Sequence, residues 1–210
     1  MDALAIEPVG GAVVLLGLWM VGLTHLHSKL WLYGLQTLAL GLLAAWIGVQ
    51  HAEPALIAAG LAVASVKGLA IPIYLGRVIR RIGCRRDEGV LLGPPLLLPA
   101  TMAALGAILL LRPYGEEVPV SALPAVGLVI TGMVLMVSRR LAVSQILGFL
   151  VLENGVFVYT VAQPHSMPLL VELGVLLDVL AGTMLAGVLA FRIRDSFDHI
   201  DVTELRHLRG

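Results

Sequence analysis

The sequence is poor in charged residues. Only 13% of its 210 residues are Asp, Glu, Lys or Arg, while 59% are hydrophobic and the mean hydropathy is +0.95. Soluble domains usually have roughly a quarter of their residues charged. A soluble domain of this length cannot bury so much apolar surface. The composition therefore excludes that class and predicts a helical membrane protein built as one compact bundle.

Cysteine is nearly absent, since Cys84 is the only one in the chain. A single cysteine excludes an intrachain disulfide, a Cys-ligated iron–sulfur cluster and the paired-cysteine ligation of a nickel–iron centre. The 6 histidines fall at span ends or in loops, whereas a membrane-embedded b-type haem needs histidine pairs well inside spans. We therefore expect no cofactor in this chain. The formal net charge of +0 gives no indication of a nucleic-acid partner.

Long apolar stretches fill most of the chain. A transmembrane helix needs about 20 consecutive apolar residues, and the N-terminus lacks the basic region of a signal peptide, so the first stretch is expected to be retained as a span. The predicted fold class is an all-α, polytopic membrane bundle of about seven transmembrane helices. The predicted spans are residues 8–26, 30–49, 54–77, 90–111, 120–137, 141–162 and 167–191.

The basic residues orient this bundle. All except Lys67 and Arg112 fall in alternate loops and in the C-terminal tail, which lie on one side of the membrane if there are seven spans. The positive-inside rule then places the N-terminus outside and the C-terminus in the cytoplasm of a prokaryotic plasma (inner) membrane. Lys29, Arg139 and Arg140 are interpreted as determinants of this topology.

Three ionisable residues lie near the centre of their spans: Lys67, Glu153 and Asp178. Lys67 is about 15 Å along a helix from Arg77, too deep to reach the headgroups easily. An intramembrane charge costs at least about 2.5–3.5 kcal/mol, so such residues face the protein interior and usually mark an ion or proton path. Glu172, near the outer end of the last span, is either a further member of the path or an interfacial residue.

Glu153 and Asp178 lie at similar distances from the short segment 163–166, so the two carboxyl groups are expected at similar depth. A contact between Lys67 and a carboxylate would act as a switch, because making or breaking it changes proton affinity. The alternative is a static ion pair that fixes helix packing.

Irregular backbone and polar side chains accompany these residues. Pro72 has no N–H, so the carbonyl of Gly68 lacks its helical partner next to Lys67. Gln145 and Asn154 are predicted to give polar support on the span of Glu153, where they can hold water inside the bundle.

The segment 138–155, SRRLAVSQILGFLVLENG, resembles subunit K (4L) of complex I and the C subunit of Mrp-type cation/proton antiporters. The C-terminal IDVTELRHLRG also resembles the end of subunit K. Its glutamate, however, lies one helical turn earlier, at the position of Leu150 here, and Glu153 is inferred to replace it from the same helix face. Asp178 matches the glutamate of the following span. The chain accordingly divides into a five-helix region (1–137), a hairpin similar to subunit K (138–191) and a cytoplasmic tail (192–210).

Subunit K has only three spans, and this chain has four more before them. The whole extended layout resembles the component E family of hydrogenase-4 and formate-hydrogenlyase complexes, nearly end to end. The most specific pieces are Val66-Lys67 followed by Pro72, LENG at 152–155, VELGVLLD at 171–178 and the IDV…LRG tail. The resemblance implies a non-redox membrane subunit of a complex-I-like, proton-translocating oxidoreductase of the group 4 nickel–iron hydrogenase type. Its partners would be antiporter-like membrane subunits, a cytoplasmic iron–sulfur and nickel–iron redox arm, and the lipid bilayer.

Two other functions are consistent with the residues. One is a subunit of an Mrp-type antiporter, although the four extra N-terminal spans argue against it because that family's C subunit is short. The other is a structural scaffold whose charges only fix helix packing. No nucleophile–base pair, metal cluster or phosphate-binding loop indicates a catalytic site in the chain itself.

Overall fold

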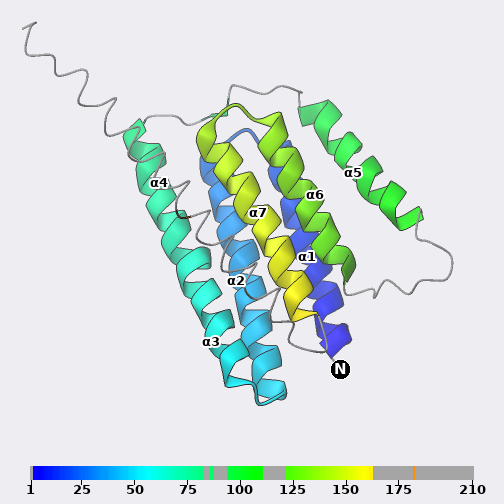
Figure 1. Ribbon diagram of the computed structural model, residues 1–210. Coiled ribbons are helices and arrows are strands. Elements are labelled where there is room, and N and C mark those ends of the chain that lie inside the picture. Colours follow the sequence, from blue (N-terminus) through cyan, green and yellow to red (C-terminus); the bar gives the residue numbers. More distant parts are fainter. Residues whose placement is uncertain (1, 83–85, 88–93, 111–121, 163–181, 183–210) are drawn as a thin grey trace, which may run out of the picture.

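The computed structural model describes residues 2–82, 86–87, 94–110, 122–162 and 182, and this part of the chain is helical apart from short connections and one isolated bridge between His25 and Arg86 (Figure 1). The elements in chain order are α1 (Asp2–Gly22), α2 (Leu26–Gln50), α3 (Pro54–Ala62), the π-helix η1 (Val63–Ala70), α4 (Ile71–Ile82), α5 (Pro94–Leu110), α6 (Leu123–Ser138) and α7 (Ala142–Val161).

Three helices in the described ranges are long and apolar enough to cross a membrane: Leu26–Gln50, Pro54–Arg80 and Ala142–Val161. Shorter apolar helices run from Ile6 to Gly22, from Leu96 to Ala107 and from Leu123 to Ser138. Together with the composition, these helices identify a helical membrane protein. The first six predicted spans coincide with helices, and the seventh, 167–191, lies outside the described residues except for Gly182.

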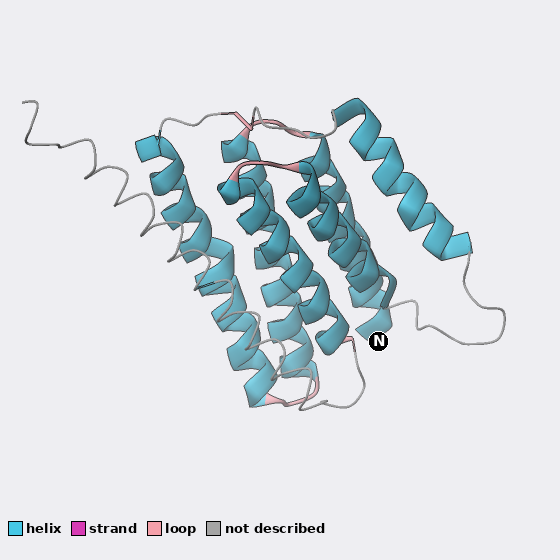
Figure 2. Cartoon of the chain, turned by 45° about the horizontal axis from the view of Figure 1, so that its top comes forward, coloured by secondary structure: helices cyan, strands magenta, loops and turns pink. Residues whose placement is uncertain are grey.

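α2 lies at the centre of the described helices. It packs on one side against the continuous rod of α3, η1 and α4, and on the other against α1 and α7 (Figures 1 and 2). α6 and α7 form a hairpin, and α5 stands at the edge beside α1 and α6. The rod and α7 both pack against α2, so residues of η1 and α7 can meet beside that helix.

Glycine pairs bring these helices unusually close together. A Cβ atom on Gly132 of α6 would lie 2.6 Å from the carbonyl oxygen of Gly148 on α7, and one on Gly60 of α3 would lie 2.6 Å from that of Gly41 on α2. Only glycine fits at such backbone-to-backbone contacts. The contacts fix the positions of α7 and of the α3–η1–α4 rod, the two elements that supply the buried charges.

The turn between α2 and α3 contains the only non-glycine residue with positive φ among the described residues, Ala52, at 53°. The N–H of Ala52 donates to the carbonyl of Val49, and the N–H of Glu53 donates to that of Gly48. This is the Schellman arrangement that ends many helices, and glycine usually occupies the position of Ala52. The turn holds the two antiparallel helices in register at the expense of backbone strain at Ala52.

We expect Ala52→Gly to raise the free energy of unfolding by about 0.5–1 kcal/mol, because glycine adopts this φ without a Cβ clash. Equilibrium unfolding in mixed micelles measures the change. Ala58→Gly in the exposed part of α3 is the control and should lower stability by about 1 kcal/mol. A loss of stability at both positions would contradict the role assigned to the turn.

Candidate functional site

A lysine and a glutamate from different helices form an ion pair inside the bundle. Lys67 Nζ lies 3.0 Å from Glu153 Oε2, and the two side chains are only 10% and 3% exposed. Lys67 comes from η1 and Glu153 from α7. An isolated charge at such a place is strongly unfavourable in a bilayer, whereas a paired one is tolerated. The fold thus brings together two of the residues that the sequence singled out.

The position of Leu150 is informative because subunit K has its glutamate there. Leu150 is fully buried in α7, one helical turn before Glu153. The acidic residue that contacts Lys67 is Glu153, which lies one helical turn after the position of Leu150, toward the C-terminal end of α7.

Lys67 lies on an irregular stretch of backbone. The helix is of the π type from Val63 to Ala70, and the N–H of Ile71 donates to the carbonyl of Val66, five residues earlier. Pro72, which lacks an N–H, follows directly. π-Helical turns are rare and frequently occur at functional sites. A Cβ atom on Gly34 would lie 3.1 Å from the carbonyl oxygen of Gly68, so α2 packs directly against this segment.

Next to Glu153, Asn154 begins a chain of hydrogen bonds that crosses three helices. Its Nδ2 donates to Thr37 Oγ1 at 2.8 Å and to Gln36 Oε1 at 3.2 Å, and Gln36 Nε2 donates to the carbonyl of Val13 at 2.7 Å. All three side chains are fully buried. Asn154 Oδ1 has no hydrogen-bond donor among the described residues, so it can accept from water or from another group in the site.

Gln36 and Thr37 were not identified from the sequence. The available signal was their position as adjacent polar residues in the middle of the predicted span 30–49. Polar side chains inside a bilayer need partners, but which helix supplies a partner depends on packing.

A second buried cluster lies at the other end of the same helices and centres on Asp87. Lys29 Nζ donates to Asp87 Oδ2 at 2.9 Å, Ser144 Oγ donates to the same oxygen, and Arg139 Nε lies 3.7 Å from it. Arg139 Nη2 also donates to the carbonyls of Val21 at 2.7 Å and Leu23 at 3.2 Å. The cluster ties together the connections α1–α2, α4–α5 and α6–α7.

The sequence interpretation of Lys29 and Arg139 as topology determinants is incomplete. Both side chains are about 1% exposed and surround Asp87, a residue that sequence reasoning missed. An acidic residue directly after the basic run Arg85-Arg86 was the only signal. Burial lowers the pKa of the Arg139 guanidinium from its usual value, and the charge of Asp87 counteracts that effect. Arginine nevertheless remains charged near neutral pH.

The remaining predicted site residues lie elsewhere or outside the description. Gln145 Nε2 donates to the carbonyl of Arg139 at 3.0 Å, which places it at the Asp87 cluster, two turns from Glu153. Asp178 and Glu172 lie outside the described residues. Within the described ranges, no group of three or more His, Cys, Asp or Glu side chains is arranged to hold a metal ion.

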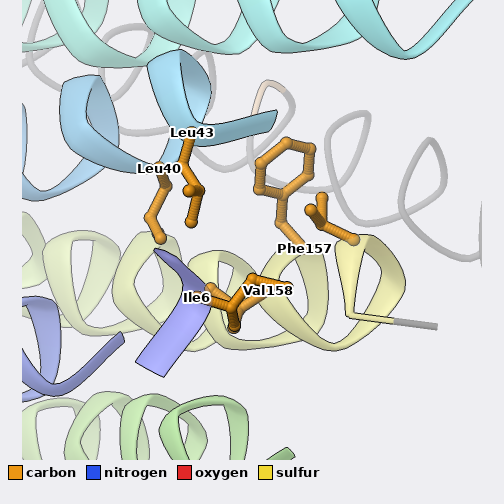
Figure 3. Close-up of a pocket in the computed structure, with 6 residues that line it drawn as sticks. Ile6, Leu40, Leu43, Phe157 and Val158 are labelled. Atoms are coloured by element: carbon orange, nitrogen blue, oxygen red, sulfur yellow. The ribbon is translucent and has the colours of Figure 1, made fainter. Parts of the chain in front are cut away.

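Beyond Glu153, toward the C-terminal end of α7, the interior is apolar. A small cavity of about 10 Å³ is lined by Ile6 of α1, Leu40 and Leu43 of α2, and Phe157, Val158 and Val161 of α7 (Figure 3). A buried water needs at least about 10–15 Å³ and two to four polar partners. The side chains that line it offer no such partners, so these walls do not favour a bound water.

The sequence comparisons cover almost the whole chain. It is 31% identical to the uncharacterized protein Rv0085 of Mycobacterium tuberculosis (strain ATCC 25618 / H37Rv) over 217 residues, or 99% of this chain and 97% of that protein. It is 24% identical over 213 residues to hydrogenase-4 component E of Escherichia coli (strain K12) and of Shigella flexneri, with 99% of each chain covered. No family model and no solved structure matches the chain.

The ion pair can be tested by a double-mutant cycle with Lys67→Met and Glu153→Gln. Each single change removes one partner, and loss of one partner of a buried pair typically costs about 3–5 kcal/mol. We expect the double variant to lose less free energy of unfolding than the two single variants lose together. Unfolding in mixed micelles measures the three losses. Strictly additive losses would show that the two side chains do not interact.

The Asp87 cluster gives a separate prediction. Asp87→Asn leaves Lys29 and Arg139 as buried cations without a counter-charge, and we expect a loss of stability of about 3–5 kcal/mol. Adding Lys29→Met to Asp87→Asn should restore part of the lost stability, because one of the two buried cations is then absent. Glu53→Gln, in the exposed α2–α3 turn, is the control and should change stability by less than about 0.5 kcal/mol. Equal effects at Asp87 and Glu53 would refute the structural role of the cluster.

Proposed function

From its relatives we propose a function for this chain, which belongs to the same protein family as Rv0085 of Mycobacterium tuberculosis. Hydrogenase-4 component E is a more distant full-length homologue. We propose that the chain is a non-redox membrane subunit of a complex-I-like, proton-translocating oxidoreductase. The proposed complex is of the group 4 nickel–iron hydrogenase type. The chain would span the plasma membrane about seven times, with its N-terminus outside and its C-terminus in the cytoplasm.

The buried pair of Lys67 and Glu153 is the observation that carries the proposal. It is an ionisable contact at the centre of two long apolar helices, next to a π-helical segment and a hydrogen-bonded polar chain. A proton that arrives on the Glu153 carboxylate removes its negative charge and ends the ion pair. Lys67 then loses this negative charge beside it, and we propose that it passes a proton onward. The pair therefore has two electrostatic states.

The surroundings favour a lateral path. Among the described residues, the walls of the small cavity next to Leu40, Phe157 and Val158 offer no polar group that could pass a proton along α7 (Figure 3). A path along the membrane plane would instead connect this pair with adjoining antiporter-like subunits. Asp178 and Glu172 of the predicted last span are proposed as its further members, and Asn154 as a hydrogen-bonding support.

The Asp87 cluster fits a role at the cytoplasmic end. It fixes three connections of the bundle to one another through buried charges. A redox arm that docks on this side would meet a rigid surface. The cluster is thus proposed to transmit force or orientation rather than protons.

A scaffold function is the second candidate, and one observation favours it: both buried charge clusters are already paired within the chain. In that case the ion pairs only fix helix packing. Neutralising Glu153 would then reduce the amount of assembled complex and leave proton translocation per turnover unchanged.

The experiment begins with purification of the complex from native membranes in mild detergent and identification of the partners by mass spectrometry. We expect iron–sulfur and nickel–iron-type subunits and antiporter-like chains to co-elute. Recovery of the chain alone, or only with cation-antiporter subunits, would refute the oxidoreductase assignment.

In the assembled complex, reconstituted in liposomes, we expect Glu153→Gln to reduce protons translocated per electron pair to about half or less of the wild-type value, because one protonatable group of the path is lost. The redox turnover of uncoupled liposomes should persist. Glu53→Gln serves as the matched control, since Glu53 is exposed in the turn between α2 and α3. Wild-type stoichiometry with Glu153→Gln would refute the proton-path role.

A further inference from the structure

A groove runs along the outside of the bundle between α2 and the η1–α4 rod. Its volume is about 290 Å³, and its floor includes Gly34 on α2 and Gly68, Pro72 and Gly76 on the opposite rod. Glycines on both facing elements leave a trough where larger side chains would otherwise meet. The groove is separate from the ion pair, because Lys67 and Glu153 do not line it.

The walls of the groove are apolar and face outward. Trp31 and Leu35 on α2 are 66% and 55% exposed, and Leu69 and Ile73 on the rod are also exposed. Both elements are long and apolar enough to cross the membrane. None of the described helices covers the trough, so in a membrane this face of the described bundle is open to hydrocarbon.

One end of the groove carries hydrogen-bond donors and positive charge. Arg80 lies at the end of the α4 wall, and His27 lies at the start of the α2 wall, both exposed. The indole N–H of Trp31 donates to His27 Nε2 at 3.0 Å. Since Nε2 accepts, the proton of the neutral ring is on Nδ1, so His27 can donate to a ligand. Tryptophan is also enriched at the headgroup level of membranes.

We propose that this groove binds one anionic phospholipid, with an acyl chain along the Gly34–Gly76 trough and the phosphate against Arg80 and His27. The cationic end is complementary to a negative headgroup and the remaining wall is complementary to hydrocarbon. The volume is close to the lower limit of ligand pockets, about 300–1,000 Å³.

Occupation of the groove would also touch the irregular backbone. Gly68 and Pro72, which line the trough, follow Lys67 in the chain, and Gly68 belongs to the same π-helical segment. The lipid would support the π-helical segment from the outer side while Glu153 contacts it from the inner side. The lipid site itself does not depend on the proposed proton path.

The test uses the full chain in mild detergent, native mass spectrometry, and titration with phosphatidylglycerol and phosphatidylcholine that carry identical acyl chains. We expect one phosphatidylglycerol to be retained in preference to phosphatidylcholine. Arg80→Gln should weaken phosphatidylglycerol binding about fivefold, the effect of one basic residue near an anionic headgroup. Arg77→Gln, one turn earlier on α4 and outside the groove, should leave binding unchanged.

Filling the trough gives a second measurement. Gly76→Leu should abolish retention of the lipid, and it fits the fold because a Cβ atom there meets only Leu30, at 3.4 Å. Gly106→Leu is the matched control, since no atom of the described residues lies within 4 Å of a Cβ atom at that site on α5. Equal retention of the two lipids, or equal losses in the Arg77 and Arg80 variants, would overturn the proposal.

Photo-cross-linking in native membranes separates the lipid from a partner helix. Benzoylphenylalanine at position 35, in the groove, is expected to give lipid adducts, and the same group at position 42 is the control. Leu42 is 58% exposed, two turns later on α2 and outside the groove. A polypeptide adduct at position 35 would show that a neighbouring subunit covers the groove and would refute the lipid site.

Discussion

A charge inside a bilayer must have a partner, and the contact between Lys67 and Glu153 satisfies that requirement at the centre of this bundle. The surrounding packing is organised so that the two side chains can meet. The glycine contact between Gly132 and Gly148 sets α7 on α6, and the contact of Gly34 with the carbonyl of Gly68 sets α2 on the π-helical segment. The ion pair is also a contact that protonation could change, since apolar contacts do not respond to protons.

The same electrostatic requirement is met in two different ways along the helices. At the connections between helices, the Asp87 carboxylate contacts two cationic side chains and one hydroxyl group, so several interactions hold it in place. In the middle of the bundle, Lys67 contacts Glu153 beside the Asn154 amide, whose oxygen has no hydrogen-bond donor among the described residues. The first arrangement is typical of a rigid joint, because many bonds would have to break together. A proton on Glu153 would remove the charge from the second arrangement, which is why we propose the proton-path role for Lys67 and Glu153.

The depth of buried charges could be predicted from the sequence, but their partners could not. The distance of Lys67 from Arg77 along the helix placed it inside the membrane, and the resemblance to subunit K directed attention to Glu153. Gln145 was grouped with Glu153 because both lie on one span, yet it bonds to the carbonyl of Arg139. Linear spacing gives depth and helix face, whereas a partner on another helix depends on how the helices rotate and cross.

The sequence by itself determined the class of protein, a helical membrane protein, and the positions of the helices. A long apolar run must form helix in a bilayer because every backbone N–H and C=O needs a partner there, so the predicted spans coincide with helices wherever the structure describes them. Only the tertiary structure decided that Lys67 meets Glu153, that Gln36 and Thr37 hold Asn154, and that Asp87 collects Lys29 and Arg139. These pairings join residues far apart in the chain. They follow from close glycine contacts and a π-helical turn, which set helix rotation and leave no periodic signal in the sequence.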